Sequence, residues 1–207
     1  MATKEPASNL TKTRLTLLAL LVLFLAPIIL ARVAVNQGWL EGAARPHSGH
    51  LIIPPVGLVE LNAKLESASF TASEIPDSWW LVYIAPEDCA QACHNSLYKM
   101  NLAADALNSE QTQVRQLLIE PHSREERLHR LLEDEAFRDL RVTTATPQAV
   151  NHALRDYVDD TERASEAGYL YLMNPRGNLL MYYPPTEVES QVEQKAAEIR
   201  EDIQSLL

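Results

Sequence analysis

The sequence predicts an α/β fold: a mixed β-sheet flanked by helices, preceded by one N-terminal transmembrane helix. From residue 79 onward, short apolar runs of strand length alternate with amphipathic segments of helical periodicity. Such alternation is typical of a sheet with helices on both faces. Near the N-terminus, residues 15–31 contain no charged side chain. Extended to Val35, this stretch reaches the roughly 17–25 residues that cross a bilayer as a helix.

The charges before the apolar stretch predict its orientation. Lys4, Lys12 and Arg14 precede it, and short basic flanks tend to stay in the cytoplasm. We therefore expect a cytoplasmic N-terminus (residues 1–14) and a membrane anchor (residues 15–35). A cleaved signal peptide is the alternative, but Arg32 interrupts the best small-residue cleavage site.

The remainder of the chain is predicted to lie outside the cytoplasm. Residues 36–55 are rich in Gly and Pro and are expected to form a linker, followed by one folded domain over residues 56–207. The expected location is the bacterial inner membrane, with a single pass and the C-terminal domain in the periplasm.

The charge balance excludes one class of partner. The chain has a net charge of −10, and residues 36–207 alone carry 14 basic and 27 acidic side chains, a net charge of about −13. Nucleic-acid binding requires a basic footprint. We therefore expect no nucleic-acid partner.

The individual elements follow from the apolar periodicity. The final helix is expected to begin at Thr186, because Glu189 three residues later completes the pattern of a capping box. The resulting order of strands and helices is typical of a thioredoxin-like fold. Strands are predicted at residues 79–85, 114–120, 140–145, 169–173 and 178–183, and helices at residues 90–108, 124–138, 147–158 and 186–207.

The two cysteines, Cys89 and Cys93, mark the candidate site. They lie between the first predicted strand and the following helix. Two thiols so placed can form a disulfide or bind a soft metal ion such as Cu(I). The helix N-terminus favours the thiolate form, whereas Glu87 and Asp88 oppose it. A disulfide that only holds the loop together is the third interpretation.

Several motifs follow one another in a fixed order. They are the cysteine loop at residues 89–94 (CAQACH), Leu97–Met100, residues 119–124 (IEPHSR) after the next strand, and residues 171–177 (YLMNPRG). In this order they resemble the Cys-Pro-x-x-Cys-Pro loop, the Leu-x-x-Met segment, the Asp-Pro pair and the hairpin of the Sco/SenC family, copper-handling proteins that assist cytochrome c oxidase assembly. The similarity covers roughly residues 56–207. The resemblance implies a thioredoxin-like domain, an N-terminal anchor and a copper site.

The chain departs from the family pattern at the copper site. Ala90 and His94 replace the two prolines of the cysteine loop. The family's third copper ligand is a histidine five residues before the hairpin tyrosine, and that position holds Glu166. A carboxylate is a hard ligand that is poorly suited to Cu(I). The metal-ligand candidates are therefore Cys89, Cys93 and His94, and copper is the expected cofactor if one binds.

Three other histidines carry no site prediction. His122, His129 and His152 lie among polar neighbours and are expected to face solvent.

Three functional hypotheses remain open. The first is a non-enzymatic assembly factor for cytochrome c oxidase, acting through its thiol pair on respiratory oxidase subunits or with other assembly factors. The second is a thiol:disulfide oxidoreductase, in which Cys89 and Cys93 are the catalytic residues. The third is a redox-inert binding module with a structural disulfide.

Overall fold

The computed structural model divides the chain into two units, residues 1–46 and 47–207. The structure describes residues 14, 16–17, 20–21, 23–26, 48–76, 78–109, 113–122, 126–158 and 162–206. In the first unit the described residues are helical, and most of the predicted anchor lies outside them. Within the described part of the chain, no helix is both long and apolar enough to cross a membrane. The anchor and the domain boundaries stay predictions.

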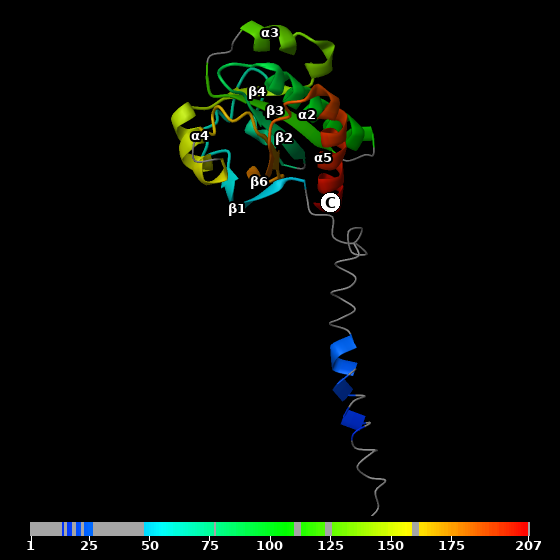
Figure 1. The fold of residues 1–207 in the computed structure, drawn as a ribbon. Helices are drawn as coiled ribbons and strands as arrows, with labels where there is room; N and C mark the ends of the chain where they lie inside the picture. Colours follow the sequence, from blue (N-terminus) through cyan, green and yellow to red (C-terminus); the bar gives the residue numbers. More distant parts are fainter. Residues whose placement is uncertain are drawn as a thin grey trace, which may run out of the picture. The chain divides into compact units, whose positions relative to one another are not determined.

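The second unit is built around one mixed six-stranded sheet (Figure 1). Its strands are β1 (His50–Gly57), β2 (Trp79–Ile84), β3 (Val114–Glu120), β4 (Arg141–Thr144), β5 (Leu170–Met173) and β6 (Asn178–Tyr183). Their spatial order is β1-β6-β5-β2-β3-β4. Strands β2, β3 and β4 pair in parallel, whereas β5, β6 and β1 pair antiparallel. The central strand β2 consists of aromatic and aliphatic residues and is buried from Trp80 to Ile84, as expected for a strand covered on both faces.

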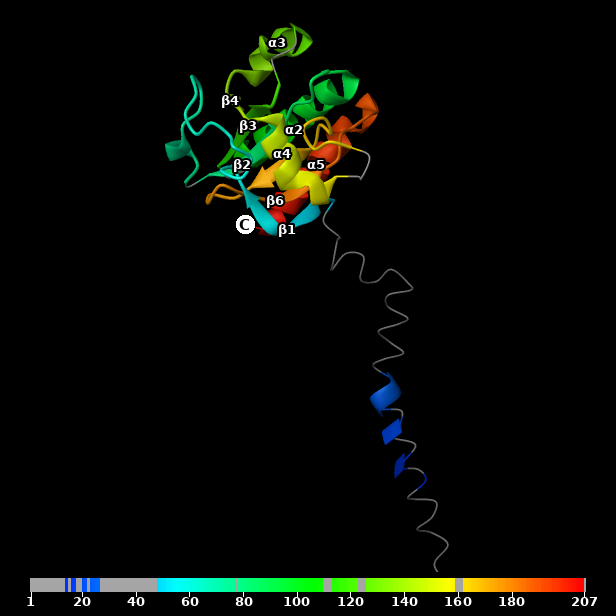
Figure 2. The same cartoon turned by 90° about the vertical axis from the view of Figure 1, so that its left-hand side faces the viewer.

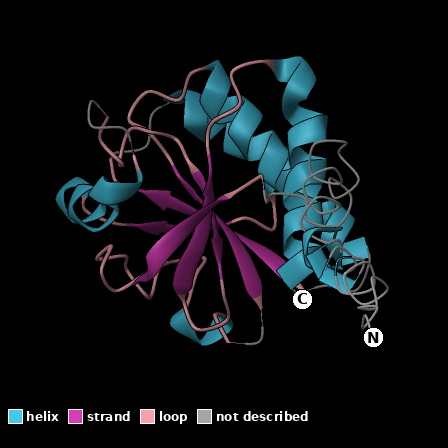
Figure 3. Cartoon of the chain, turned by 60° about the horizontal axis from the view of Figure 1, so that its bottom comes forward, coloured by secondary structure: helices cyan, strands magenta, loops and turns pink. Residues whose placement is uncertain are grey.

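Helices cover both faces of the sheet (Figures 1 and 2). The described α-helices of this unit are α2 (Gln91–Ser109), α3 (Glu126–Leu132), α4 (Pro147–Leu154) and α5 (Val192–Leu206). The described residues also form the short 3-10 turns η1 (Ala72–Glu74), η2 (Glu135–Phe137), η3 (Arg155–Tyr157) and η4 (Glu189–Gln191). Helices α2 and α5 pack against each other and share one apolar core with one face of the sheet. Helix α4 and the segment after β1 form the core on the other face. The predicted thioredoxin-like mixed sheet flanked by helices is confirmed, and Figure 3 shows its strands crossing between the helical layers.

The N-terminal edge of the sheet lies within the predicted linker. Strand β1 begins at His50 and pairs with β6 despite Pro54 and Pro55. Its register shifts between Leu51 and Val56, around the two prolines. An edge strand tolerates proline because the missing N–H leaves no partner strand unpaired.

Two helix predictions were wrong in detail. Thr186 is buried and does not cap a helix; its carbonyl oxygen accepts a hydrogen bond from Asn95 Nδ2 at 2.9 Å. Helix α5 begins six residues later, after the 3-10 turn η4. The helix predicted at residues 124–138 ends at Leu132, and Asp134 then caps the separate turn η2 by accepting the N–H of Ala136.

Candidate functional site

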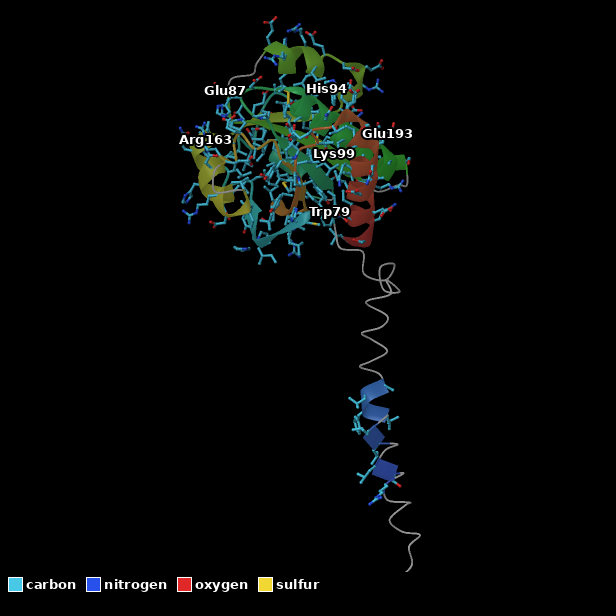
Figure 4. The ribbon with its side chains drawn as sticks, viewed as in Figure 1. Trp79, Glu87, His94, Lys99, Arg163 and Glu193 are labelled. Atoms are coloured by element: carbon cyan, nitrogen blue, oxygen red, sulfur yellow. A yellow bond between two sulfur atoms is a disulfide. The ribbon has the colours of Figure 1, made fainter. Side chains whose placement is uncertain are left out.

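The candidate site lies where β2 passes into α2. Cys89 and Cys93 form a disulfide, with 5.1 Å between their Cα atoms. That separation is within the range for unstrained bridges, about 4.4–6.8 Å. Figure 4 shows Glu87 and His94, which flank the cysteines in sequence, at the end of this unit opposite Trp79 at the start of β2. The predicted juxtaposition of the two sulfur atoms at a strand-to-helix junction is therefore present.

The disulfide is shielded from solvent. Cys89 is 6% exposed and Cys93 is 3% exposed, and both belong to the apolar core shared by α2 and α5. Their neighbours Asp88 and Ala90 are exposed. The bridge therefore lies directly beneath an exposed loop, and Cys89 is the less buried of its two residues.

The start of α2 provides the electrostatic environment of the cysteines. The N–H groups of Cys93 and His94 both bond the carbonyl oxygen of Ala90, at 3.1 and 3.2 Å, which closes the first helical turn. Cys89 precedes that turn, at the positive end of the helix dipole, where a thiolate is stabilised after reduction. Asp88 opposes this effect, but Arg127 lies 3.5 Å from its carboxylate and partly offsets the negative charge.

His94 lies on a different face of α2 from Cys93. Its ring lies 4.6 Å from that of Tyr98, one turn further along the helix. It also lines a groove with Val192 and Glu193 at the start of α5. Among the described residues, His94 does not join Cys89 and Cys93 in a cluster of metal-ligating atoms.

A second group of polar side chains adjoins the cysteine loop. One carboxylate oxygen of Glu166 accepts the backbone N–H of Glu87 at 3.0 Å. The other lies 2.7 Å from His122 Nε2, at the end of β3. The segment before β5 therefore contacts both the cysteine loop and the end of β3. We call Glu87, His122 and Glu166 the Glu-His-Glu cluster.

The close approach of these segments depends on Gly168. This residue has a φ of +61°, in the left-handed region that glycine adopts without strain. A Cβ atom here would lie 3.3 Å from the Tyr83 hydroxyl and 3.9 Å from Pro86 Cδ. Glycine thus lets the segment that carries Glu166 pack against the start of the cysteine loop.

The expectation that His122 faces solvent was wrong. Its side chain is 20% exposed and pairs with Glu166, because β3 ends beside β2 in the parallel part of the sheet. His129 and His152 are exposed, as predicted. The signal that could have indicated the pairing was the position of Glu166, which aligns with a ligand of the Sco/SenC family, together with a histidine at the end of the neighbouring strand.

Comparison with protein families identifies the domain. A family model described as "Transmembrane-like, thioredoxin-like, C-terminal domain" matches residues 79–207. The chain belongs to this family. The match begins at the first residue of β2 and includes the cysteine loop and the Glu-His-Glu cluster. A search of curated protein sequences found no match.

Solved structures resemble this thioredoxin-like domain in fold. Apo Sco1 from Thermus thermophilus is 18% identical, with a TM-score of 0.50, over 77% of this chain and 96% of that chain. Copper-bound yeast Sco1 is 20% identical, with a TM-score of 0.47, over 79% and 97% of the two chains. The thioredoxin domain of a thiol-disulfide oxidoreductase from Bacteroides vulgatus is 11% identical, with a TM-score of 0.42, over 65% and 82%. The resemblance to Sco proteins predicted from the sequence is thus confirmed at the level of fold.

The residues of this family member do not provide the three-ligand copper site that the Sco resemblance implies. Both sulfur atoms are joined to each other, so neither is a thiolate. Glu166, at the position of the missing histidine, accepts the N–H of Glu87 and lies 2.7 Å from His122 Nε2. A carboxylate is also a poor ligand for Cu(I). Reduction would release two soft ligands, Cys89 and Cys93, but among the described residues no histidine joins them in a group of metal-ligating atoms.

Proposed function

We propose that this thioredoxin-like protein is a membrane-anchored assembly factor for a respiratory oxidase, acting through Cys89 and Cys93 as a reversible thiol–disulfide pair. The observation that carries the proposal is the disulfide at the junction of β2 and α2. Further support comes from the ordered sequence resemblance to the Sco/SenC family and from the fold shared with a Sco1 protein.

The proposed reaction exchanges two electrons with a partner cysteine pair. In the reduced state, the Cys89 thiolate attacks a sulfur atom of the partner's disulfide and displaces one partner thiolate, giving a mixed disulfide. The Cys93 thiolate then attacks the Cys89 sulfur and releases the second partner thiolate. The partner is reduced to a dithiol, and this chain ends with the Cys89–Cys93 bridge. The reverse sequence oxidises a partner dithiol.

Cys89 is assigned as the attacking residue. It is less buried than Cys93, and it precedes the first turn of α2. Cys93 lies inside that turn with its side chain in the apolar core. Since both residues are less than one tenth exposed, the proposal requires the exposed loop around Asp88 to move when a partner docks.

The anchor and the location belong to the same proposal. The charge-free stretch from residue 15 to residue 31 follows a basic N-terminus, and described residues within it, such as Leu17 and Phe24, are helical and more than 60% exposed. Apolar side chains exposed in this way suit a lipid environment. The domain would then lie in the periplasm, where a disulfide persists.

Burial of the sulfur atoms favours one other candidate function. A disulfide within an apolar core is typical of a structural bridge that never exchanges. In that case the domain would act as a redox-inert binding module. The redox candidate requires the two thiols for function, whereas the binding module requires only the folded surface.

A complementation experiment separates the two functions. In a strain lacking this gene, the wild-type chain should restore cytochrome c oxidase activity, whereas the Cys89→Ser, Cys93→Ser double variant should not. Immunoblotting must show equal amounts of both proteins in the membrane. Full restoration by the double variant would overturn the redox proposal in favour of the binding module.

Single variants test the assigned order of attack. Cys93→Ser retains Cys89 and should accumulate a mixed disulfide with an oxidase subunit or another assembly factor, cleaved by dithiothreitol. Cys89→Ser is the matched control and should accumulate none, because Cys93 is the resolving residue.

A separate Cu(I) titration of the reduced chain examines metal handling. Stoichiometric binding that disappears in the double variant would show that the reduced thiols hold copper.

A further inference from the structure

The Glu-His-Glu cluster assembles metal-ligating groups from three separate parts of the chain. Glu87 lies in the loop after β2, His122 follows β3, and Glu166 lies in the segment before β5. One ligand atom from each residue lies within 4.8 Å of the other two. Among the described residues, this is the single group of three or more histidine, cysteine or acidic side chains that meets this spacing.

The Nε2 atom of His122 lies close to Glu166 but makes no hydrogen bond to it. Nε2 of His122 is shielded from solvent and has no hydrogen bond of acceptable geometry in the described part of the chain. A Glu166 oxygen nevertheless lies 2.7 Å away. The nitrogen and the carboxylate therefore approach each other without a directional hydrogen bond. An ion bound by both groups would provide the partner that this nitrogen lacks.

The spacing fits a small transition-metal ion. Zn²⁺ binds imidazole nitrogen and carboxylate oxygen at about 2.0–2.2 Å, so ligand atoms of one tetrahedral shell lie about 3.4 Å apart. In the cluster, His122 Nε2 and Glu166 Oε1 are 2.7 Å apart, and all three ligand atoms lie within 4.8 Å of one another. The separation expected for a tetrahedral shell falls within this range. Glu87 is exposed, so its side chain can adjust without disturbing the core.

We propose that Glu87, His122 and Glu166 form a binding site for a divalent transition-metal ion, of which Zn²⁺ is the representative. One imidazole and two carboxylates are borderline and hard ligands, which suit a divalent ion and disfavour Cu(I). Three protein ligands leave a fourth position for water.

The site differs from a thiolate copper site in both ligands and redox dependence. None of its three residues is a cysteine, so the ion binds while the Cys89–Cys93 bridge is intact. Because Glu87 is two residues before Cys89, a bound ion would tie the cysteine loop to the end of β3 and to the segment before β5. The inference does not depend on the redox activity of the disulfide.

Zinc binding by the oxidised protein tests the inference. The full chain, in detergent and freed of metal with EDTA, is titrated with Zn²⁺ by isothermal calorimetry. One equivalent should bind to the wild type and equally to the Cys89→Ser, Cys93→Ser double variant. The His122→Gln and Glu166→Gln variants should each weaken binding by about tenfold or more. Glu166→Gln keeps an oxygen that can accept the Glu87 N–H. Weaker Zn²⁺ binding by this variant would therefore result from the lost negative charge and not from a change in the cysteine loop.

The matched control is His129→Ala, which removes an exposed histidine that lies 3.7 Å from Glu133. This variant should bind Zn²⁺ as the wild type does. Circular dichroism confirms that each variant is folded, and a variant that fails this check is replaced by Glu87→Gln, whose side chain is exposed. Absence of one-equivalent binding, equal affinity in the cluster variants and the wild type, or loss of binding in the cysteine double variant would overturn the inference.

Discussion

Glu166 holds the cysteine loop, because its carboxylate accepts the backbone N–H of Glu87 at 3.0 Å, two residues before Cys89. Replacing Glu166 with Ala removes this bond, and a hydrogen bond to a charged group contributes about 1.5–3 kcal/mol when well shielded. Glu166 is partly exposed, so we expect the lower end. The variant should be reduced by dithiothreitol about tenfold faster than the wild type, measured by trapping free thiols over time.

The control for that experiment is Glu162→Ala, an exposed residue of the same segment. Its disulfide should be reduced at the wild-type rate. Equal rates in wild type and Glu166→Ala would show that this hydrogen bond does not limit access to the bridge.

The Cys89–Cys93 bridge should stabilise the fold to a modest extent. The loop that it closes is very short, with a sequence separation of 4. The chain-entropy relation then gives about 2 kcal/mol. Urea unfolding of oxidised and reduced protein should differ in unfolding free energy by about this amount. A much larger loss, or unfolding on reduction, would contradict a bridge that opens during function.

Because of Lys99, the unfolding free energy should vary with pH in the alkaline range. Its side chain is buried and Nζ donates a hydrogen bond to the Pro184 carbonyl oxygen at 2.8 Å. Burial and the nearby charge of Lys195, opposed by Glu198, together lower the pKa of Lys99 to about 8. The unfolded chain keeps the ordinary value of 10.5, so above pH 8 it binds a proton that the native state lacks. Stability contributed by Lys99 therefore rises with pH in that window.

The comparison variant is Lys99→Met, which removes the titrating group. Between pH 8 and pH 9.5 the unfolding free energy of the wild type should rise by about 2 kcal/mol relative to this variant, since one pKa unit corresponds to about 1.4 kcal/mol. Lys64→Met, at an exposed position, should follow the wild type. Parallel pH profiles of the wild type and Lys99→Met would contradict the assignment.

Glu74 joins the turn η1 to two strands. Its Oε2 lies 2.8 Å from Arg115 Nη1 in β3 and 3.0 Å from Arg141 Nε in β4. Burial raises the pKa of Glu74, but the bond from Arg141, the N–H of Thr71 and the two arginine charges together hold it below its ordinary value. This stability is present above the unfolded pKa of 4.5 and is lost as the pH falls.

Glu74→Gln should therefore lower the unfolding free energy at pH 7 by about 1 kcal/mol, a value suited to a partly exposed ion pair. The difference should shrink as urea unfolding is repeated at acidic pH. Glu66→Gln, an exposed residue of the same segment, serves as control. A difference between wild type and Glu74→Gln that does not change with pH would indicate a packing effect instead.

The strands and most helices could be predicted because their signals are local. The apolar run at residues 79–85 and the turn before β6 determine their structure with little help from the rest of the chain. Strand β1 was missed because Pro54 and Pro55 are typical of a linker. This segment belongs to the sheet because it pairs with β6, which is far away in sequence. Thr186 and Glu189 matched the pattern of a capping box. In the structure, however, the Thr186 carbonyl oxygen accepts a hydrogen bond from Asn95 in α2, and no helix begins there.

The candidate site was predictable only in part. The spacing of Cys89 and Cys93 after an apolar strand predicted that the two sulfur atoms meet. It could not predict their burial, which depends on how α2 packs against α5. The contact between His122 and Glu166 joins two loops that are far apart in sequence. Such a contact follows from the order of strands in the sheet, which the local pattern does not determine.

The reduction potential of the Cys89–Cys93 bridge tests the proposed function most directly. Oxidised full-length protein is equilibrated with dithiothreitol or glutathione buffers of known potential, and free thiols are counted after alkylation. A reversible pair should have a potential above about −300 mV, within reach of cellular thiol couples. A potential well below about −300 mV would identify a structural bridge and contradict the account.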